Sequence, residues 1–322
     1  MPLPDGRWHF QHGPIDLVIG ADGEAAAVAA AHQAAWRRFE TVLDELVAEL
    51  PRLRRPVTDG PCPLDGAVAR RMWQACARVR GGAFITPMAA VAGAVADELI
   101  AAYARDGVAR AWVNNGGDIA LQLAPGRSLR VGIFADLARL DLRRLPRGLA
   151  LDGAFRVTAA SPVRGIATSG WRGRSFSRGI ADSATVLAAT GALADAAATM
   201  IANAVDVDDP RIVRAPADAL KDDSDLGALL VTTAVPPLPA DRVAAALDAG
   251  ATRAGELQAA GLIAGAALIC QREVRVVGAA AAITGDGDGG TASGIGRQAG
   301  HAGQTQVTPG RVDATLESVV AD

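Results

Sequence analysis

The glycine pair Gly116-Gly117 constrains the fold of this chain more than any other local feature, because it interrupts a run of strand-forming residues. AWVNN precedes the pair and IALQL begins one residue after it, so we expect a strand on each side. Glycine adopts backbone conformations that other residues avoid, and it lets a ligand approach the backbone closely. Asp118 could then orient a polar group of the ligand, with Asn114 or Asn115 as amide donors. The alternative is a bulge or tight turn that carries a solvated acid.

Helical and strand-like patterns alternate along the rest of the chain. The spacing of apolar residues predicts helices at about 23–50, 65–79, 89–105, 191–204, 239–249 and 253–260. Strand-like segments lie at 7–20, as a hairpin, and at 128–135, 151–159, 165–170, 184–188, 225–235 and 262–277. Pro51 is expected to end the first helix, and Gly107 the third.

Composition excludes several classes of protein. Half of the 322 residues are hydrophobic, so the chain can bury a substantial core. The net charge of -3 argues against a nucleic-acid binder, which usually shows a basic face. Three scattered cysteines are too few for a disulfide framework or a zinc site. No signal peptide and no membrane span are readable, so we expect a cytoplasmic protein without a membrane partner.

The last part of the chain differs in composition from the rest. From Gly285 onward it is rich in glycine, threonine, glutamine and serine, with almost no large apolar residues. Such a segment does not bury enough surface to order itself. We therefore expect one domain over 1–284 and a flexible tail over 285–322.

A five-residue motif occurs twice. GAVAD spans 93–97 and GALAD spans 191–195, which is 98 residues later, and both lie in alanine-rich helical segments. A match of this length can arise by chance in such a composition. If the repeat is genuine, it implies two related halves that each place one acid in a similar position on a helix.

The second motif leads into a possible metal site. Asp195 and Thr199 are four residues apart, so a helix would place them on one face. A carboxylate and a hydroxyl among alanines can approach a hard cation, and Mg²⁺ prefers such oxygen ligands. The alternative is that Asp195 favours the dipole of its own helix and that Thr199 bonds to its helix backbone.

A third polar cluster lies between these motifs. Thr168, Ser169 and Gly170 end a strand and lead into a polar loop. Arginines near hydroxyls and free backbone amides suit phosphate oxygens, although an exposed polar loop would have the same composition. The arginines of this loop are Arg172, Arg174 and Arg178. No Ser-His-Asp or Cys-His set is readable, so a nucleophile mechanism has no support in the sequence.

The order of these motifs is more specific than any one of them. ITPMAAVAGAVADEL, VNNGGDIAL, IATSG and ALADAAATM, in this order, resemble the ApbE superfamily of flavin-handling proteins, over about residues 80–205. The pattern is most similar to an uncharacterised, leaderless branch of that superfamily. The resemblance implies an α+β fold, a duplicated T-fold in which antiparallel sheets are packed by long helices.

The resemblance also implies a function and a site. ApbE-type enzymes transfer the FMN part of FAD to a threonine of a partner protein, with Mg²⁺. Asp195 would be catalytic and would hold the metal with Thr199 and a main-chain carbonyl near Ala90. The flavin nucleotide would lie against Met88, Ala89, Asn115, Gly116, Gly117, Asp118, Thr168, Ser169, Gly170 and Arg174.

One motif of those enzymes is absent. They usually carry a histidine, an Asp-Pro and a Thr-Gly where this chain reads RSFSRGIADSATVLA. Arg174 stands in the area of the histidine, and Asp182 is the candidate replacement acid. Three functions therefore stay open: a Mg²⁺-dependent flavin-nucleotide transferase or hydrolase, with a protein as acceptor; a noncatalytic flavin- or nucleotide-binding accessory protein in redox or sulfur metabolism; and a structural homo-oligomer with a relic site.

Overall fold

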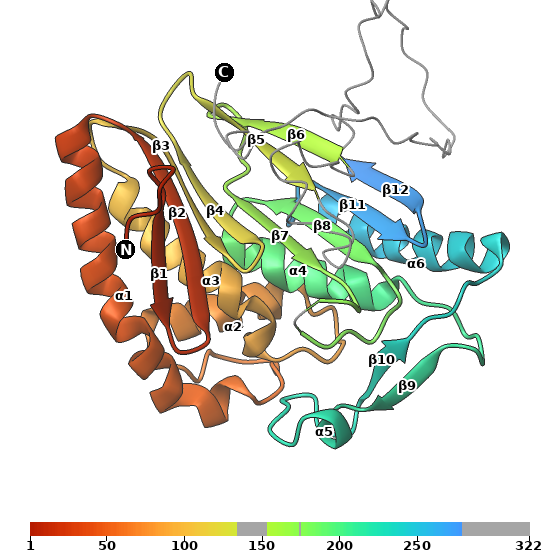
Figure 1. Ribbon diagram of the computed structural model, residues 1–322. Helices are drawn as coiled ribbons and strands as arrows, with labels where there is room; N and C mark the ends of the chain where they lie inside the picture. The colour runs from red at the N-terminus through yellow and green to blue at the C-terminus, as the bar shows by residue number, and fades with distance from the viewer. Residues whose placement is uncertain (134–152, 174, 279–322) are drawn as a thin grey trace, which may run out of the picture.

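The computed structural model describes residues 1–133, 153–173 and 175–278 of the chain (Figure 1). Eight strands form one antiparallel sheet. In spatial order they are β1 (Trp8–His12), β2 (Ile15–Gly23), β3 (Val108–Asn115), β4 (Asp118–Leu123), β7 (Gly165–Ser169), β8 (Ser183–Ala188), β11 (Gly265–Cys270) and β12 (Glu273–Gly278).

Helices pack on one face of this sheet (Figure 1). They are α1 (Ala25–Leu53), α2 (Ala67–Val79), α3 (Val91–Ile100), α4 (Gly191–Ala204) and α6 (Ala240–Ala259), with 3-10 turns η1 (Pro87–Ala90) and η2 (Ala101–Tyr103). Two smaller units complete the fold. One pairs β5 (Ser128–Ile133) with β6 (Gly153–Thr158), and the other contains β9 (Val213–Pro216), α5 (Ala217–Leu220) and β10 (Leu230–Ala234).

Both halves of the large sheet follow one plan. In each half a hairpin is followed by helices and then by a second hairpin that pairs beside the first: β1-β2-β3-β4, then β7-β8-β11-β12. The halves join where β4 pairs with β7 through Ile119 and Ile166. The strand registers place all four hairpin connections at the same end of the sheet. The predicted α+β fold with antiparallel sheets and long helices is confirmed.

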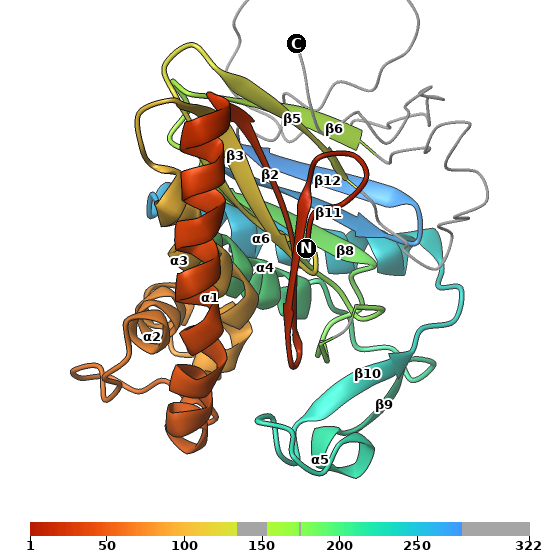
Figure 2. The same cartoon turned by 60° about the vertical axis from the view of Figure 1, so that its left-hand side comes forward.

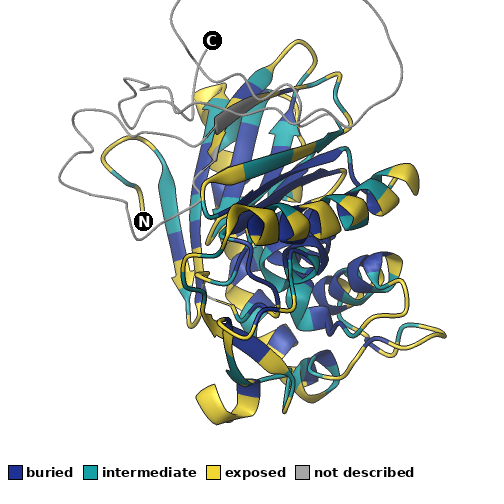
Figure 3. Cartoon of the chain, turned by 90° about the vertical axis from the view of Figure 1, so that its right-hand side faces the viewer, coloured by how far each residue is buried: buried dark blue, intermediate teal, exposed yellow. Residues whose placement is uncertain are grey.

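The sheet separates two hydrophobic cores. Because strand residues alternate between faces, Ala120 of β4 joins the core under the helices, while Leu121 joins the core under β5 and β6. In α4, alanines are buried on nearly every side, as a helix at the centre of the helical layer requires. The outer helix faces are exposed (Figure 3). Among the described helices, none is long and apolar enough to cross a lipid bilayer.

Two predicted helix boundaries are wrong. Pro51 does not end α1, which continues to the buried Leu53. A proline in the last helical turn removes only one backbone hydrogen bond, and exposed Val47 carries the carbonyl that loses it. The predicted helices 239–249 and 253–260 are one helix, α6. Gly250 serves packing there, because an added Cβ would lie 2.3 Å from Cγ2 of Val205.

Other boundaries shift within predicted elements. The predicted helix 89–105 is a 3-10 turn, the shorter helix α3 and a second 3-10 turn. Gly107 has the expected positive φ of 84°, but it lies in the turn into β3. The strand predicted at 225–235 is limited to β10, and β9 and α5 were not predicted. The predicted domain boundary and the tail over 285–322 lie outside the described residues.

The single strand predicted at 262–277 is a hairpin. It reverses at Gln271 and Arg272, whose φ angles of 46° and 77° are uncommon for residues other than glycine. The Asp182 carboxylate accepts the Gln271 N–H at 2.6 Å. The Gln271 side chain accepts the Leu238 N–H at 2.9 Å and donates to the Pro236 carbonyl at 2.7 Å. Contacts from distant segments therefore hold a turn that has no glycine.

Candidate functional site

The glycine pair forms the two-residue turn between β3 and β4. Gly116 and Gly117 have φ angles of 65° and 116°, and positive values at both positions suit a tight hairpin. The side-chain oxygen of Asn114 accepts the Gly117 N–H at 2.8 Å. A Cβ added to Gly117 would meet nothing within 4 Å. The pair is thus a tight turn whose outer side is open.

Asp118, directly after the turn, is not a solvated acid. It is partly buried, and its position in β4 places it on the same face as Ala120, toward the helices. Its carboxylate accepts the Thr168 N–H at 3.2 Å. Burial raises the pKa of Asp118 to about 7, and the Thr168 N–H opposes this shift only in part.

Asp195 on α4 is the second acid of the site. Its Oδ2 accepts the Gly93 N–H at 3.0 Å, at the beginning of α3. Burial raises the pKa of Asp195 well above its usual value, and the nearby charge of Asp118 raises it further. N–H groups of Gly93 and Ala92 act in the opposite direction. No lysine or arginine in the described part of the chain pairs with either carboxylate, so only backbone N–H groups offset their mutual repulsion.

The two copies of the repeated motif contact each other. Asp97 on α3 accepts the N–H groups of Gly191 and Ala192 at 2.7 and 2.8 Å, at the beginning of α4. A Cβ added to Gly93 would lie 2.2 Å from the Gly191 carbonyl oxygen, so the helix backbones touch. The two motifs lie on helices at different places in the two halves. Helix α3 comes directly before the second hairpin of its half, whereas α4 comes directly after the first hairpin of its half. The repeat instead forms a mutual helix contact.

The turn and the first residues of α3 are joined by a side chain. Asn115 Nδ2 donates to the Ala92 carbonyl at 3.1 Å. The 3-10 turn η1 leads directly into α3, with Ala90 fully buried and Met88 and Ala89 partly buried. The structure therefore brings three predicted segments together: η1 with the N-terminal end of α3, the glycine turn, and the first half of α4.

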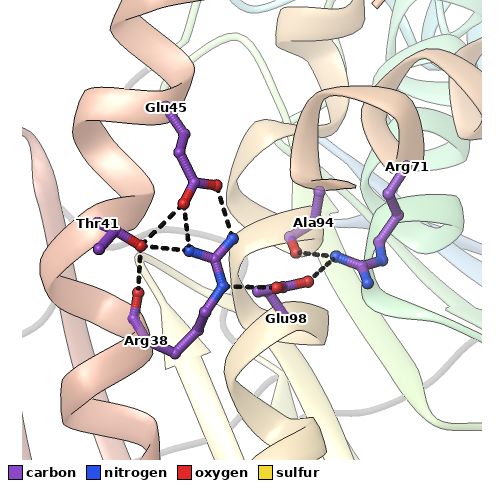
Figure 4. A network of polar contacts seen from close by, with 6 residues as sticks. All are labelled: Arg38, Thr41, Glu45, Arg71, Ala94 and Glu98. Atoms are coloured by element: carbon purple, nitrogen blue, oxygen red, sulfur yellow. Dashed lines mark hydrogen bonds and ion pairs between the residues drawn. The ribbon is translucent and has the colours of Figure 1, made fainter. Parts of the chain in front are cut away.

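Glu98, next to Asp97, fixes α3 against two other helices (Figure 4). It accepts hydrogen bonds from Arg38 of α1 at 2.7 Å and from Arg71 of α2 at 2.8 Å. Arg71 also donates to the Ala94 carbonyl at 3.3 Å. Since only 15% of the Glu98 side chain is exposed, this network holds the position of α3 against solvent competition.

The predicted residues at the end of β7 divide between the two faces of the sheet. Because strand residues alternate between faces, the Thr168 side chain lies on the same face as that of Ile166, which is in the core away from the helices. The Thr168 hydroxyl lies 2.8 Å from the Thr185 hydroxyl. Only the Thr168 N–H reaches Asp118. Ser169 is partly buried. Gly170 allows close backbone packing, because an added Cβ would lie 2.4 Å from the Asp182 carbonyl oxygen.

Asp182 makes contacts away from the acid pair. Its Oδ1 accepts the Trp171 indole N–H at 3.3 Å, and the Arg172 Nε lies 3.6 Å from the same oxygen. Its other oxygen holds the turn at Gln271. Asp182 therefore connects the arginine loop to β11 and β12, and no contact joins it to Asp118 or Asp195 within the described chain. Arg174 lies outside the described residues.

The donor set at the acid pair fits a hard cation. Two carboxylates, main-chain carbonyls at the start of α3 and Thr199, one helical turn after Asp195 and partly buried, offer the oxygens that Mg²⁺ prefers. A cation would also relieve the repulsion between Asp118 and Asp195. In the described part of the chain, no group of three or more His, Cys, Asp or Glu is arranged to hold a metal. Further ligands would therefore come from hydroxyl, carbonyl, water or phosphate oxygens.

Sequence comparison assigns the chain to a family. The sequence model of the family described as AbpE bacteria matches residues 1–276. The chain belongs to this family. A UPF0280 protein of Methanosphaerula palustris is 35% identical over 200 residues, which cover 62% of this chain and 77% of the relative. A UPF0280 protein of Methanopyrus kandleri is 36% identical over 200 residues, which cover 61% of this chain and 72% of the relative.

Two solved structures are similar to this AbpE-family chain. A mutant of the flavin transferase ApbE from Vibrio cholerae aligns over 85% of this chain and 98% of its own, with a TM-score of 0.44 and 12% identity. The ApbE protein from Thermotoga maritima aligns over 70% of this chain and 94% of its own, with a TM-score of 0.36 and 14% identity.

Sequence patterns did not single out Asp225, which the structure places against Thr86, beside the site. The Thr86 hydroxyl donates a hydrogen bond to its carboxylate, and Thr86 immediately precedes η1. The two residues are far apart in the sequence, and no local motif links them. The one available signal is the acid-rich stretch KDDSD at 221–225.

Proposed function

We propose that this AbpE-family protein binds a flavin nucleotide together with Mg²⁺ at the pair formed by Asp118 and Asp195. One observation carries the proposal: Asp118 and Asp195 are partly buried, the charge of Asp118 raises the pKa of Asp195, and neither has a basic partner among the described residues. Bound Mg²⁺ would neutralise these acids and the phosphate groups of the nucleotide.

Each part of the site has a distinct role in this proposal. Asp195, Thr199 and a main-chain carbonyl near Ala90 would hold the cation, with Asp118 facing it from β4. Asp195 is already oriented by the N–H of Gly93, as outer hydrogen bonds orient the carboxylate ligands of metals.

The nucleotide would lie along the open side of the glycine turn. The exposed Gly116 and Gly117 leave the backbone accessible. Asn115 joins this turn to the start of α3, and Met88 and Ala89 lie in the 3-10 turn that directly precedes α3. The four motifs shared with ApbE-type proteins, together with membership of the AbpE family, support a flavin nucleotide as the class of ligand.

Binding without turnover is the function that the geometry supports best. The loop after β7 lacks the histidine of the ApbE-type enzymes. Asp182, the candidate replacement acid, uses its carboxylate to hold Trp171 and Gln271. A group committed to two structural hydrogen bonds is poorly suited to exchange protons with a substrate.

One observation supports a second candidate, a Mg²⁺-dependent hydrolase or transferase that cleaves FAD and passes FMN to a protein. Burial raises the pKa of Asp118 to about 7. A carboxyl group that titrates near neutral pH can take up or release a proton during a reaction.

Titration of the purified protein with FAD, with and without Mg²⁺, tests both candidates. We expect flavin fluorescence to report Mg²⁺-dependent binding, and Asp195→Asn to weaken it at least tenfold, on the order expected for the loss of a metal ligand. Asp44→Asn, at an exposed position of α1, is the matched control. Release of AMP would favour the enzyme. Absence of Mg²⁺-dependent binding in the unmodified protein, or normal binding by Asp195→Asn, would show that the proposal is wrong.

A further inference from the structure

The segment between α4 and α6 forms a separate small unit that stands away from the large sheet (Figures 1 and 2). It contains the two-stranded sheet of β9 and β10 with the single turn α5 between them. A two-stranded sheet has little stability of its own in water. Its few contacts with the rest of the protein therefore determine where it lies.

The first contact is made by Asp225, in the loop that precedes β10. Its carboxylate accepts a hydrogen bond from the Thr86 hydroxyl. Only 2% of Thr86 is exposed, and Asp225 is partly buried. A hydrogen bond to a carboxylate is stronger than one between neutral groups, and a buried hydroxyl without a partner is costly. This contact therefore anchors the loop on Thr86.

Thr86 in turn fixes the beginning of η1. Its carbonyl accepts the Ala89 N–H at 3.1 Å and the Cys76 thiol at 3.3 Å. Met88, Ala89 and Ala90 follow in the same turn. The position of Thr86 thus sets the backbone that leads into α3.

Asp195 and Asp225 lie near the same buried thiol, that of Cys76. Burial raises the pKa of Cys76, and the charges of Asp195 and Asp225 raise it further. Both carboxylates are therefore near Cys76, on α2. The small unit reaches the neighbourhood of Asp195 through its Asp225 loop.

A second contact ties the same unit to the arginine loop. The Thr232 N–H of β10 donates to the Ser177 carbonyl at 2.8 Å, and its hydroxyl donates to the Arg178 carbonyl at 3.3 Å. The unit is thus held to two separate segments, one before η1 and one after β7.

We infer that Asp225 is a positioning residue of the candidate site: through Thr86 it fixes the Met88–Ala90 turn, against which the nucleotide and its cation would bind. The effect on ligand binding rests on the proposed function. The effect on the turn rests only on the hydrogen bonds described above.

Four variants separate these effects. Asp225→Ala removes the acceptor, whereas Asp225→Asn keeps an oxygen that can accept from Thr86. Thr86→Val removes the hydroxyl and leaves Asp225 in place. Asp223→Asn is the matched control, because Asp223 lies in the same loop but pairs with Arg54 of the α1 C-terminus at 2.7 Å and is half-exposed.

Hydrogen–deuterium exchange of a peptide covering 84–92 measures how well the backbone amides of the turn are protected, without any ligand. We expect faster exchange in Asp225→Ala and Thr86→Val, and near-normal exchange in Asp225→Asn and in the control. Titration with FAD and Mg²⁺ should show affinity reduced about tenfold in the first two variants, as for the loss of an outer partner of a metal ligand. The other two should bind normally.

Two results would overturn the inference: unchanged exchange in both Asp225→Ala and Thr86→Val, or equal acceleration in the Asp223 control, which would indicate general loosening of the loop. If one of the two disruptive variants fails to fold, the other decides. If the unmodified protein binds no FAD, the proposed function fails, and the exchange result alone decides the role of Asp225. If exchange rises while FAD affinity stays normal, Asp225 is a structural residue only and the inference is wrong.

Discussion

Asp97 and Asp195 each accept backbone N–H groups from the first turn of the helix that carries the other acid. Asp97 of α3 binds Gly191 and Ala192 of α4, and Asp195 of α4 binds Gly93 of α3. Negative charge is favourable at a helix N-terminus, so the two contacts hold the helix ends together. Asp195 therefore combines a structural role with its proposed role as a metal ligand, whereas Asp97 has only the structural contacts.

Replacing Asp97 tests the structural part of this arrangement. We expect Asp97→Ala to lower the free energy of unfolding by about 1–3 kcal/mol, because two N–H groups at the start of α4 lose their acceptor. Asp97→Asn should lose less, since its amide oxygen still accepts one hydrogen bond. Urea unfolding measures the difference. An equally small loss in Asp97→Ala and in the exposed control Asp44→Ala would contradict the capping role.

The contact between the helix backbones can be tested with two glycines. Gly93→Ala would place a Cβ 2.2 Å from the Gly191 carbonyl oxygen, so the helices must separate, and we expect a loss of more than about 2 kcal/mol. Gly255→Ala in α6 is the matched control, because nothing lies within 4 Å of its added Cβ. It should gain about 0.5–1 kcal/mol from helix propensity. Thermal unfolding of the two variants should therefore shift in opposite directions.

Much of the fold could be predicted because its signals are local. Alternating apolar residues around Gly13 and around the Gly116-Gly117 turn predicted both hairpins of the first half. The hairpin at Gln271 was missed because its turn depends on Asp182, 89 residues away in the sequence. The single helix α6 was predicted as two, 239–249 and 253–260, and the packing role of Gly250 between them was missed because Val205, which packs on it, lies in another element.

The sequence suggested residues for the candidate site but not their contacts. The motifs containing Asp118 and Asp195 were identified from their residue types, and the structure brings the two acids together. Nothing in the local sequence indicates that Asp195 caps α3 rather than favouring its own helix, because that contact depends on how two helices cross. The link between Thr86 and Asp225 was missed for the same reason.

The buried His32 should make stability fall in acid. It lies 2.7 Å from the Tyr103 hydroxyl and stacks on Trp8, and burial lowers its pKa to about 4 from 6.5. In the unfolded chain His32 binds a proton below pH 6.5, whereas in the folded chain it binds that proton only below about pH 4. This contribution to stability is therefore present above pH 6.5 and is lost as the pH falls, by about 2 kcal/mol between pH 7 and 5.

Urea unfolding at these two pH values checks this expectation. His32→Gln should show a pH dependence that is smaller by that amount, whatever its stability at pH 7. His12→Gln, at a partly exposed position of β1, is the control and should retain the full dependence. The same pH dependence in all three proteins would assign the acid loss to other groups.

The raised pKa of Asp118 should couple stability to both pH and Mg²⁺. The folded chain holds a proton on Asp118 up to about pH 7, whereas the usual pKa is 3.8. Without a cation, the stability that comes from the bound proton on Asp118 is lost as the pH rises through 7. The free energy of unfolding should fall by about 1 kcal/mol between pH 6 and 8. A divalent cation competes with the proton for the carboxylates, so Mg²⁺ should stabilise the protein more at pH 8 than at pH 6.

Thermal unfolding with Mg²⁺ and with EDTA, at both pH values, measures this coupling. Asp118→Asn should be less sensitive to pH in EDTA and should gain less from Mg²⁺ at pH 8, because its neutral amide neither titrates nor repels Asp195. Asp44→Asn should behave like the unmodified protein. If Mg²⁺ stabilises Asp118→Asn as strongly as the unmodified protein, Asp118 does not face the cation, and the metal site would be limited to the side of Asp195 and Thr199.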